Sequence, residues 1–220
     1  MPIISVLNPK GGSGKTTLTT QLARALQLSG YSVLLVDSDP QGSARDWHAV
    51  AEDNPIPLIA LDRPNNFRTL PGIAAGYDFT LIDGAAKLET LIAAVVKVSD
   101  AVLIPVQPSP YDIWAVSDLV EVIQTRQLLT DGSPKAAFVI NRAIKATRLN
   151  RDVIQALKEY DIPAFHTAII QRQVYPQTAA TGKTVFDGDN RAAIAEITGI
   201  TLDCLSLINY PLPTSLEHIA

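Results

Sequence analysis

The stretch IISVLNPKGGSGKTT, residues 3–17, joins an apolar run to a glycine-rich loop. The run over residues 3–7 has the composition of a strand that is buried on both faces. Three glycines in the loop let the backbone turn tightly enough to point its N–H groups inward, and Lys15 and Thr16 then open a segment with helical spacing. Strand, loop and helix in this order predict a phosphate-binding site at a helix N-terminus.

The two lysines of this loop have different expected roles. Lys15 neutralises the β- and γ-phosphate oxygens, and the Thr16 hydroxyl is a ligand for magnesium. Lys10 lies on the rim, where it does not easily reach the same phosphates but can reach those of a neighbouring molecule. The alternative is a glycine-rich turn that precedes a helix by chance. The predicted nucleotide-binding residues of the loop are Lys10, Gly11, Gly12, Ser13, Gly14, Lys15, Thr16 and Thr17.

Further apolar runs along the chain indicate a parallel sheet. They lie at residues 32–37, 56–61, 79–83, 101–106 and 136–141. Several are apolar on both faces, as in strands buried between two helix layers. Segments with helical spacing lie at residues 15–30, 87–99, 112–129, 151–161 and 191–208. We therefore predict an α/β fold with a doubly wound, mostly parallel sheet flanked by helices.

Length and composition favour a single domain. Residues 1–220 are predicted to form it, with loops and a short helix over residues 171–190 and a loose tail over residues 210–220. The sequence shows no basic leader and no run of about 18 apolar residues. Cys204 is the single cysteine, which excludes an internal disulfide and a multi-cysteine metal site within one chain. We expect a cytoplasmic protein in which Cys204 is a small core residue and Trp47 and Trp114 bury surface area.

Carboxylates follow two of the predicted strands. Asp37 and Asp39 come at the end of the second strand, and Asp83 ends the fourth. The carboxyl ends of parallel strands meet at the edge where doubly wound sheets bind ligands. We therefore expect these side chains to face the phosphates. The alternative for the first pair is that they cap the helix that follows.

The loop sequence PKGGSGKTT resembles the deviant Walker A box of the ParA/MinD family of ATPases, whose pattern is K-G-G-x-x-K-[ST]. The resemblance implies a P-loop ATPase that uses ATP and Mg²⁺. It also implies that Lys10 crosses a nucleotide-sandwich dimer and contacts the phosphates bound by the partner subunit. Hydrolysis would then loosen the dimer, because a contact to the γ-phosphate exists only while that phosphate is attached.

The acidic segments resemble further motifs of this family. VDSDPQGSA is similar to the Walker A′ or switch I motif, in which Asp39 would help to position the attacking water and Asp37 would lie near magnesium. Asp83 resembles the Walker B carboxylate, which holds a magnesium-bound water. Many relatives continue D-x-P-P, whereas this chain continues Gly-Ala-Ala. The resemblance thus implies catalytic roles for Lys10, Lys15 and Asp39 and metal ligation by Thr16, Asp37 and Asp83.

Three later segments carry further implied roles. Asn141, at the end of the sixth strand, resembles the Asn with which relatives contact the adenine base, and Arg142 beside it belongs to the same implied nucleotide site. Residues 165–187 resemble the C-terminal motif that partly closes over the base. The proline-rich stretch of residues 108–114 resembles the dimer and assembly surface of the small, ParF-like branch; the alternative is a rigid connection.

The whole pattern is most similar to the small, ParF-like proteins of plasmid partition. This implies an ATP-dependent homodimer, or a higher assembly, that binds DNA without sequence preference and is stimulated by a small centromere-binding adaptor of the ParB or ParG type. Such a protein would be associated with the nucleoid in the bacterial cytoplasm. The net charge of −4 still allows a local basic face. The candidate DNA contacts are Lys145, Arg148, Arg151, Arg172, Lys183 and Arg191.

Several alternative functions belong to other classes of protein. A MinD-like membrane-associated ATPase should end in a basic amphipathic helix, and no Lys or Arg follows Thr201. A nitrogenase-type reductase needs two cysteines per subunit, and a ligase that resembles dethiobiotin synthetase has no need for Lys10. A ParA-like ATPase that positions a protein cargo fits the sequence as well as plasmid partition does, because an adaptor selects the cargo.

Overall fold

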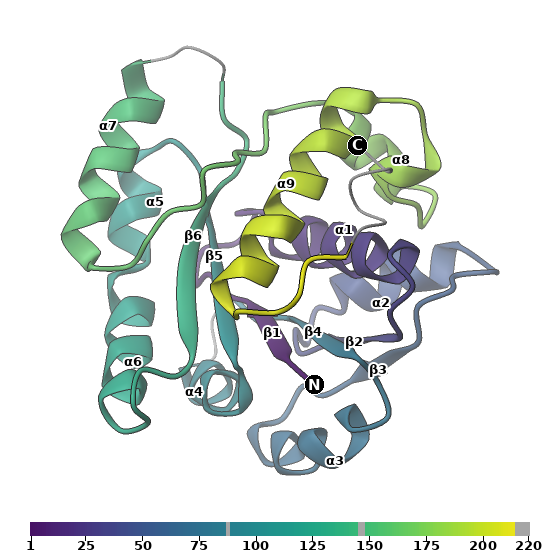
Figure 1. The fold of residues 1–220 in the computed structure, drawn as a ribbon, viewed down its shortest axis with the longest axis horizontal. Helices are drawn as coiled ribbons and strands as arrows, with labels where there is room; N and C mark the ends of the chain where they lie inside the picture. Colours follow the sequence, from purple (N-terminus) through teal and green to yellow (C-terminus); the bar gives the residue numbers. More distant parts are fainter. Residues whose placement is uncertain (87–88, 145–147, 214–220) are drawn as a thin grey trace.

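The computed structural model describes residues 1–86, 89–144 and 148–213, and it contains one six-stranded parallel sheet (Figure 1). The strand order is β3-β2-β4-β1-β5-β6. The predicted doubly wound parallel sheet is therefore confirmed. The strands are β1 (Ile3–Val6), β2 (Val33–Asp37), β3 (Leu58–Ala60), β4 (Phe79–Asp83), β5 (Ala101–Val106) and β6 (Lys135–Ile140).

Helices cover both faces of this sheet (Figure 1). The α-helices of the described residues are α1 (Lys15–Leu28), α2 (Ser43–Val50), α3 (Leu70–Ala74), α4 (Glu89–Val98), α5 (Pro110–Ala115), α6 (Ser117–Leu128), α7 (Arg148–Leu157), α8 (Val174–Ala179) and α9 (Arg191–Leu207). Short 3-10 helices lie at Pro64–Arg68, Lys158–Tyr160 and Val185–Asp187. Within the described part of the chain, none of these helices is both long and apolar enough to span a bilayer.

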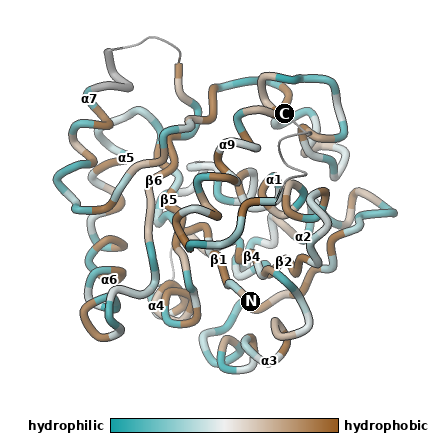
Figure 2. The backbone as a smooth tube through the Cα atoms, in the orientation of Figure 1, coloured by the Kyte–Doolittle hydropathy of each residue, from teal (hydrophilic) through white to brown (hydrophobic). Residues whose placement is uncertain are grey.

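Alternate strand residues supply the two halves of the core. Leu34 and Val36 of β2 pack into one cluster with α3, α4 and α6, whereas Val33 and Leu35 pack into the other with α1 and α9. Side chains of a strand alternate between the two faces of the sheet, so strands covered on both faces are apolar throughout. Figure 2 shows this as hydrophobic colour along much of the central strands.

The helix expected over residues 112–129 is two helices, α5 and α6, which meet at Val116. The Ile113 carbonyl accepts hydrogen bonds from the Val116 N–H at 3.3 Å and from the Tyr160 hydroxyl at 3.0 Å. This carbonyl is thus occupied by a turn and by a distant side chain, and the chain bends there. The periodicity of the sequence contains no sign of the Tyr160 contact.

The tail predicted over residues 210–220 lies partly outside the described residues, which end at 213, but its first residue is described. The Tyr210 ring packs on Tyr31 and Phe79, with ring centroids 5.8 and 4.7 Å apart, so the first residue of the predicted loose segment is anchored to the core. Cys204 is buried as expected, but Trp114 is 66% exposed, because it lies on the outer side of the short helix α5.

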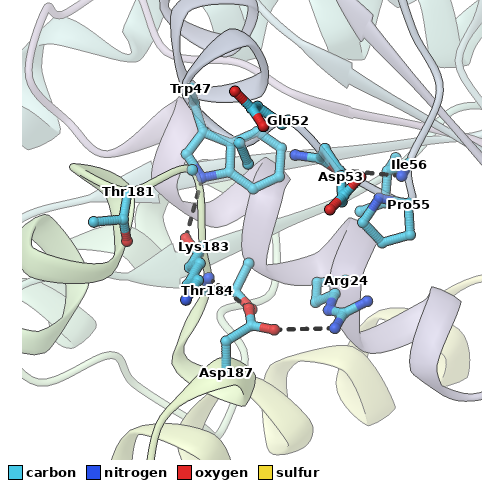
Figure 3. Close-up of a pocket in the computed structure, with 13 residues that line it drawn as sticks. Arg24, Trp47, Glu52, Asp53, Pro55, Ile56, Thr181, Lys183, Thr184 and Asp187 are labelled. Carbon is cyan, nitrogen blue, oxygen red and sulfur yellow. Dashed lines mark hydrogen bonds and ion pairs between the residues drawn. The ribbon is translucent and has the colours of Figure 1, made fainter.

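One cavity of about 370 Å³ lies between α1, the end of α2 and residues 181–187 (Figure 3). Arg24 forms an ion pair with Asp187 at 3.0 Å, and the Trp47 indole N–H donates to the Lys183 carbonyl at 3.1 Å. These contacts join the C-terminal segment to the first two helices. The cavity shares no residue with the phosphate loop.

Candidate functional site

The glycine-rich loop between β1 and α1 has the backbone conformation that an anion site needs. Gly12 and Gly14 have φ values of 75° and 98°, a region that favours glycine. Gly14 is the N-cap of α1, and no side chain forms a capping hydrogen bond at this end of the helix. The first turn of α1 contains no acidic residue. The N–H groups at the start of α1 are therefore available to an anionic ligand.

Two side chains from neighbouring strands hold the carbonyls of this loop. Gln107, just after β5, donates from Nε2 to the Gly12 carbonyl at 2.9 Å. Asn141, just after β6, donates from Nδ2 to the Ser13 carbonyl at 2.7 Å. Because Gln107 and Asn141 bind the loop carbonyls, the loop N–H groups can face a ligand on the opposite side of the loop. No sequence motif pointed to Gln107, although its place directly after a strand was a usable signal.

Asn8 fixes the entry to the loop and was also missed. Its Oδ1 accepts from the Lys10 N–H at 2.7 Å, and its Nδ2 donates to the Pro105 carbonyl at 2.7 Å. The side chain is fully buried. Asn8 thus ties the start of the loop to β5, the strand beside β1.

Lys15, the first residue of α1, lies low in the loop and is only 7% exposed. Its Nζ donates to the Lys10 carbonyl at 3.3 Å. Burial lowers the pKa of the Lys15 ammonium, whereas the carboxylates of Asp83 and Asp39 raise it. Its ammonium is thus placed where phosphate oxygens would enter the loop.

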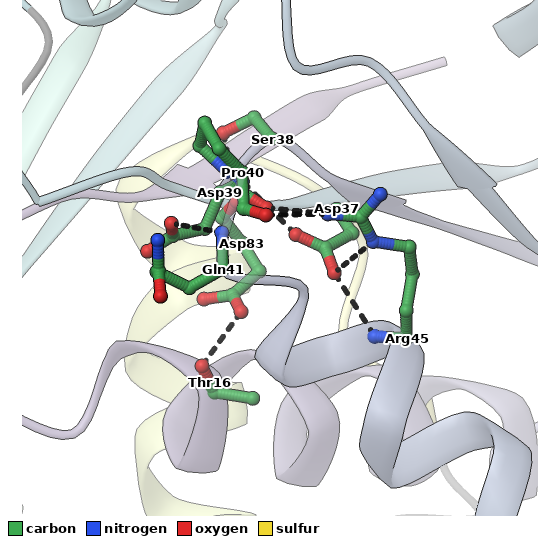
Figure 4. Close-up of polar contacts among 8 residues, drawn as sticks. All are labelled: Thr16, Asp37, Ser38, Asp39, Pro40, Gln41, Arg45 and Asp83. Atoms are coloured by element: carbon green, nitrogen blue, oxygen red, sulfur yellow. Dashed lines mark hydrogen bonds and ion pairs between the residues drawn. The ribbon is translucent and has the colours of Figure 1, made fainter.

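Thr16 and Asp83 meet at the carboxyl edge of the sheet (Figure 4). The Thr16 hydroxyl donates to Oδ2 of Asp83 at 2.7 Å, and Oδ1 of Asp83 is buried without a hydrogen-bond partner. Burial raises the pKa of the Asp83 carboxyl to about 7, with a smaller contribution of the same sign from Asp37. The Lys15 ammonium offsets part of this effect on the pKa, but the free oxygen of the buried carboxylate has no hydrogen-bond partner.

Mg²⁺ fits this place chemically. It takes oxygen ligands and commonly uses one or two carboxylates together with the phosphates of a nucleotide. The hydroxyl of Thr16 and the free oxygen of Asp83 supply such ligands. No group of three His, Cys, Asp or Glu side chains within residues 1–86, 89–144 and 148–213 could hold a metal alone. A bound nucleotide would therefore have to complete the site.

Asp37 lies beside Asp83 but is already engaged. The two residues are register partners in β2 and β4. Oδ2 of Asp37 accepts from the backbone N–H of Arg45 at 2.9 Å and from its Nε at 3.2 Å, while Oδ1 accepts from the Asp39 N–H at 2.9 Å (Figure 4). Asp37 thus stabilises the first turn of α2, which is the alternative considered for it. Its role near magnesium stays a prediction.

Asp39 lies on the turn between β2 and α2. Its Oδ1 accepts from the Gln41 N–H at 2.9 Å, and its carbonyl accepts from Arg45 Nη2 at 2.8 Å (Figure 4). The side chain is partly exposed, unlike that of Asp83. The structure brings Asp39 to the same edge as Lys15, and its role in positioning water stays a prediction.

A smaller cavity of about 190 Å³ opens beside Asn141. The residues that line it are Thr17, Asn141, Arg142, Ile169, Ile170, Gln171, Arg172, Tyr175 and Pro176. Thr17 connects this cavity to the phosphate loop, so it is the candidate place for a base. Oδ1 of Asn141 accepts from the Arg142 N–H at 2.9 Å. The Asn141 amide therefore contacts the protein through both of its polar atoms, and its predicted contact to adenine is untested.

Lys10 does not point at the phosphate site of its own chain. Its Nζ lies 2.6 Å from Oδ2 of Asp112 on α5, and its side chain is 38% exposed. Asp112 is 1% exposed, so one partner is buried and the other is accessible. Asp112 thus lies next to the loop, and the assignment of residues 108–114 to a dimer surface stays a prediction. The contact of Lys10 with a partner's phosphates stays a prediction.

The candidate DNA contacts do not form one described group. Arg172 is held by Glu196 at 2.5 Å and lines the cavity beside Asn141. Lys183 and Arg191 are exposed, on the segment before α9 and at its first turn. Lys145 and the side chains of Arg148 and Arg151 lie outside the described part of the chain.

Comparisons with known proteins agree with this geometry. Residues 4–185 match the model of the CobQ/CobB/MinD/ParA nucleotide binding domain. The chain is 32% identical over 203 residues to the Maintenance of carboxysome distribution protein A of Halothiobacillus neapolitanus, covering 90% of this chain and 93% of that protein. It is 25% identical over 214 residues to the Chromosome partitioning protein ParA of Myxococcus xanthus, covering 78% of this chain and 76% of that protein.

A solved structure has the same fold. An ATP complex of McdA from Cyanothece superposes with a TM-score of 0.78 over 96% of this chain and 98% of that chain, at 15% sequence identity. The likeness therefore extends over nearly the whole length of both chains.

Proposed function

The chain belongs to the CobQ/CobB/MinD/ParA family of nucleotide-binding domains and is a P-loop ATPase with ATP and Mg²⁺ as cofactors, and we propose that it positions a cargo through an ATP-dependent dimer. In this proposal the ATP-bound protein is a sandwich homodimer that binds DNA without sequence preference. An adaptor protein stimulates hydrolysis and so releases the dimer.

The observation that carries the proposal is that the two lysines of one loop differ in position and exposure. Lys15 is buried at the phosphate end of α1, whereas Lys10 is 38% exposed and directed toward α5. A loop that served only its own nucleotide would need one of them. A second, accessible ammonium at the rim suits a contact to phosphates bound by another subunit.

In this proposal, different residues of the chain bind the nucleotide and promote its hydrolysis. The loop N–H groups and Lys15 would bind the phosphates and hold them still, since Gln107 and Asn141 keep the loop in one conformation. Thr16 and Asp83 would hold magnesium, which neutralises phosphate charge when bound. Asp39 would orient the attacking water, and Lys10 of the other subunit would place a positive charge beside the transferred phosphoryl group.

Two observations bear on the cargo. The relative from Halothiobacillus neapolitanus is named for carboxysome distribution, and it is more similar to this chain than the Myxococcus xanthus relative that is named for chromosome partitioning. We therefore favour a protein assembly as the cargo. Segregation of a plasmid or other DNA is the second candidate, since it uses the same ATP cycle with a centromere-binding adaptor.

The ATP cycle can be tested on the purified protein. Analytical ultracentrifugation with Mg²⁺ and a slowly hydrolysed ATP analogue should show a dimer, and the same sample with ADP should show a monomer. Lys10→Ala should stay monomeric in both. A wild-type protein that remains monomeric with the ATP analogue would refute the positioning cycle.

The cargo requires an experiment in the cell. Deleting the gene should disperse or cluster the protein assemblies of its host if these are the cargo, while plasmid retention over many generations stays normal. Loss of plasmids with normal assembly spacing would instead support DNA segregation. If the deletion changes neither assembly spacing nor plasmid retention, the proposed positioning role is wrong.

A further inference from the structure

Lys10 and Asp112 form an ion pair within one chain, although they are 102 residues apart in sequence. Nζ of Lys10 lies 2.6 Å from Oδ2 of Asp112. The carboxylate comes from the first turn of α5, directly above the rim of the phosphate loop. The proposed ATP cycle gives Asp112 no individual role.

Asp112 is the buried partner of this ion pair. The side chain is 1% exposed, and its other oxygen, Oδ1, is buried without a hydrogen-bond partner. Removing one partner of a buried charge pair leaves the other charge uncompensated, which is costly. Lys10, which is 38% exposed, can leave the pair more easily than Asp112 can gain contact with water.

One ammonium cannot hold Asp112 of its own chain and also cross to the phosphates of a second chain. We propose that Asp112 is a positioning residue that stores Lys10 against its own subunit while no nucleotide is bound and releases it when the ATP dimer forms. This inference rests on the proposed function, because it assigns the alternative position of Lys10 to a partner's nucleotide.

The exchange has a direct consequence for the cycle. When the dimer forms, Lys10 leaves Asp112 and the buried carboxylate loses its counter-charge. This cost in free energy is offset only if the Lys10 ammonium contacts several phosphate oxygens of the partner's nucleotide. ADP lacks the γ-phosphate, so the balance returns to the pair with Asp112. The buried carboxylate thus raises the threshold for dimerisation and sharpens its dependence on ATP.

A purely structural role for Asp112 predicts something different. An acid in the first turn of α5 stabilises this helix through the helix dipole, and Lys10 would then be an incidental neighbour. In that case the removal of the charge would weaken α5 and would not favour dimerisation.

The test compares Asp112→Asn, Lys10→Ala and the double variant with the wild type. Asp112→Asn keeps the shape of the side chain, and with the slowly hydrolysed ATP analogue it should form dimers at about one tenth of the wild-type protein concentration, since a difference of about 1.4 kcal/mol is tenfold. The double variant should behave like Lys10→Ala. Unchanged or weaker dimerisation of Asp112→Asn would overturn the proposal, and so would a gain that persists without Lys10.

A second measurement does not require the dimer. Acetylation of lysines in the nucleotide-free monomer, followed by mass spectrometry, should label Lys10 several-fold faster in Asp112→Asn than in the wild type, with Lys97 labelled at an unchanged rate as an internal reference. Asp118→Asn, an exposed acid on α6, is the matched control and should leave Lys10 unchanged. Equal labelling of Lys10 in Asp112→Asn and the wild type would refute storage. Faster labelling of Lys10 in Asp112→Asn, together with a wild-type protein that forms no dimer with the ATP analogue, would support storage of Lys10 and refute the proposed function.

Discussion

Asn141 lies directly against Gly14: a Cβ atom at Gly14 would come within 2.0 Å of Asn141 Nδ2, the atom that donates to the Ser13 carbonyl at 2.7 Å. The end of β6 and the phosphate loop thus fit together only because one residue has no side chain. The amide that was expected to contact a base therefore touches the loop that is expected to hold phosphates.

Asn141→Ala should weaken ATP and GTP binding by the same factor, about 10-fold, because it removes one buried hydrogen bond that holds the loop. Calorimetric titration of both nucleotides in the presence of Mg²⁺ checks this. If Asn141 contacts adenine instead, the variant should lose affinity for ATP and keep its affinity for GTP.

Gly14→Ala should abolish nucleotide binding and destabilise the nucleotide-free protein by roughly 1–3 kcal/mol, because the new Cβ meets Asn141 at a φ of 98°. Urea denaturation without nucleotide measures the loss. Gly11→Ala is the control for stability, since nothing lies within 4 Å of its added Cβ. Equal stability of the two variants would contradict the packing of Asn141 on the loop.

The buried Asp83 makes the nucleotide-free protein sensitive to pH. The pKa of its carboxyl is raised from 3.8 to about 7, so its favourable contribution is complete below about pH 4 and is lost as the pH rises through 7. At 1.36 kcal/mol per pKa unit the loss is at most about 4 kcal/mol.

Asp83→Asn should therefore be more stable than the wild type at pH 8, by roughly 2 kcal/mol, and should lose this advantage near pH 5. Denaturation at both pH values without nucleotide or Mg²⁺ checks it. ATP hydrolysis should be absent in this variant, because the carboxylate beside Thr16 is gone. A variant that is less stable at both pH values would show that Asp83 is not held at a cost.

Lys183 and Arg191 are the exposed cations to test for DNA binding, because Arg172 is held by Glu196. Lys183→Ala with Arg191→Ala should weaken binding of the ATP form to duplex DNA and reduce the slope of log K against log salt by about 0.9 for each phosphate that is no longer neutralised. Fluorescence anisotropy at several salt concentrations measures both quantities. Lys135→Ala, an exposed cation at the start of β6, should change neither. An unchanged salt slope in the double variant would exclude these two residues as DNA-binding residues.

The sequence predicted the elements of secondary structure that neighbouring residues specify. The apolar runs identified every strand, and the segment over residues 3–17 identified the strand, loop and helix of the phosphate site. Apolar periodicity and glycine spacing act over a few residues, so they can be interpreted without tertiary contacts. The helical segments predicted from spacing did not include α2, Pro64–Arg68 or α3. Prolines and a glycine interrupt the periodicity of the last two.

The sequence alone did not predict which partners the side chains have in the folded protein. Sequence placed Asp37 and Asp83 at one edge of the sheet, since parallel strands end together. It did not show that Arg45 engages Asp37 while one oxygen of Asp83 is left free. This difference depends on where α2 begins relative to β2, which is set by packing.

The sequence by itself thus determined the fold, the phosphate loop and the presence of two lysines with one set of phosphates to share. Only the tertiary structure decided that Lys10 pairs with Asp112, that Gln107 and Asn141 hold the loop, and that Trp114 is exposed. The physical reason is distance along the chain. Backbone conformation is specified by neighbouring residues, whereas the environment of a charge depends on the segments that folding brings beside it.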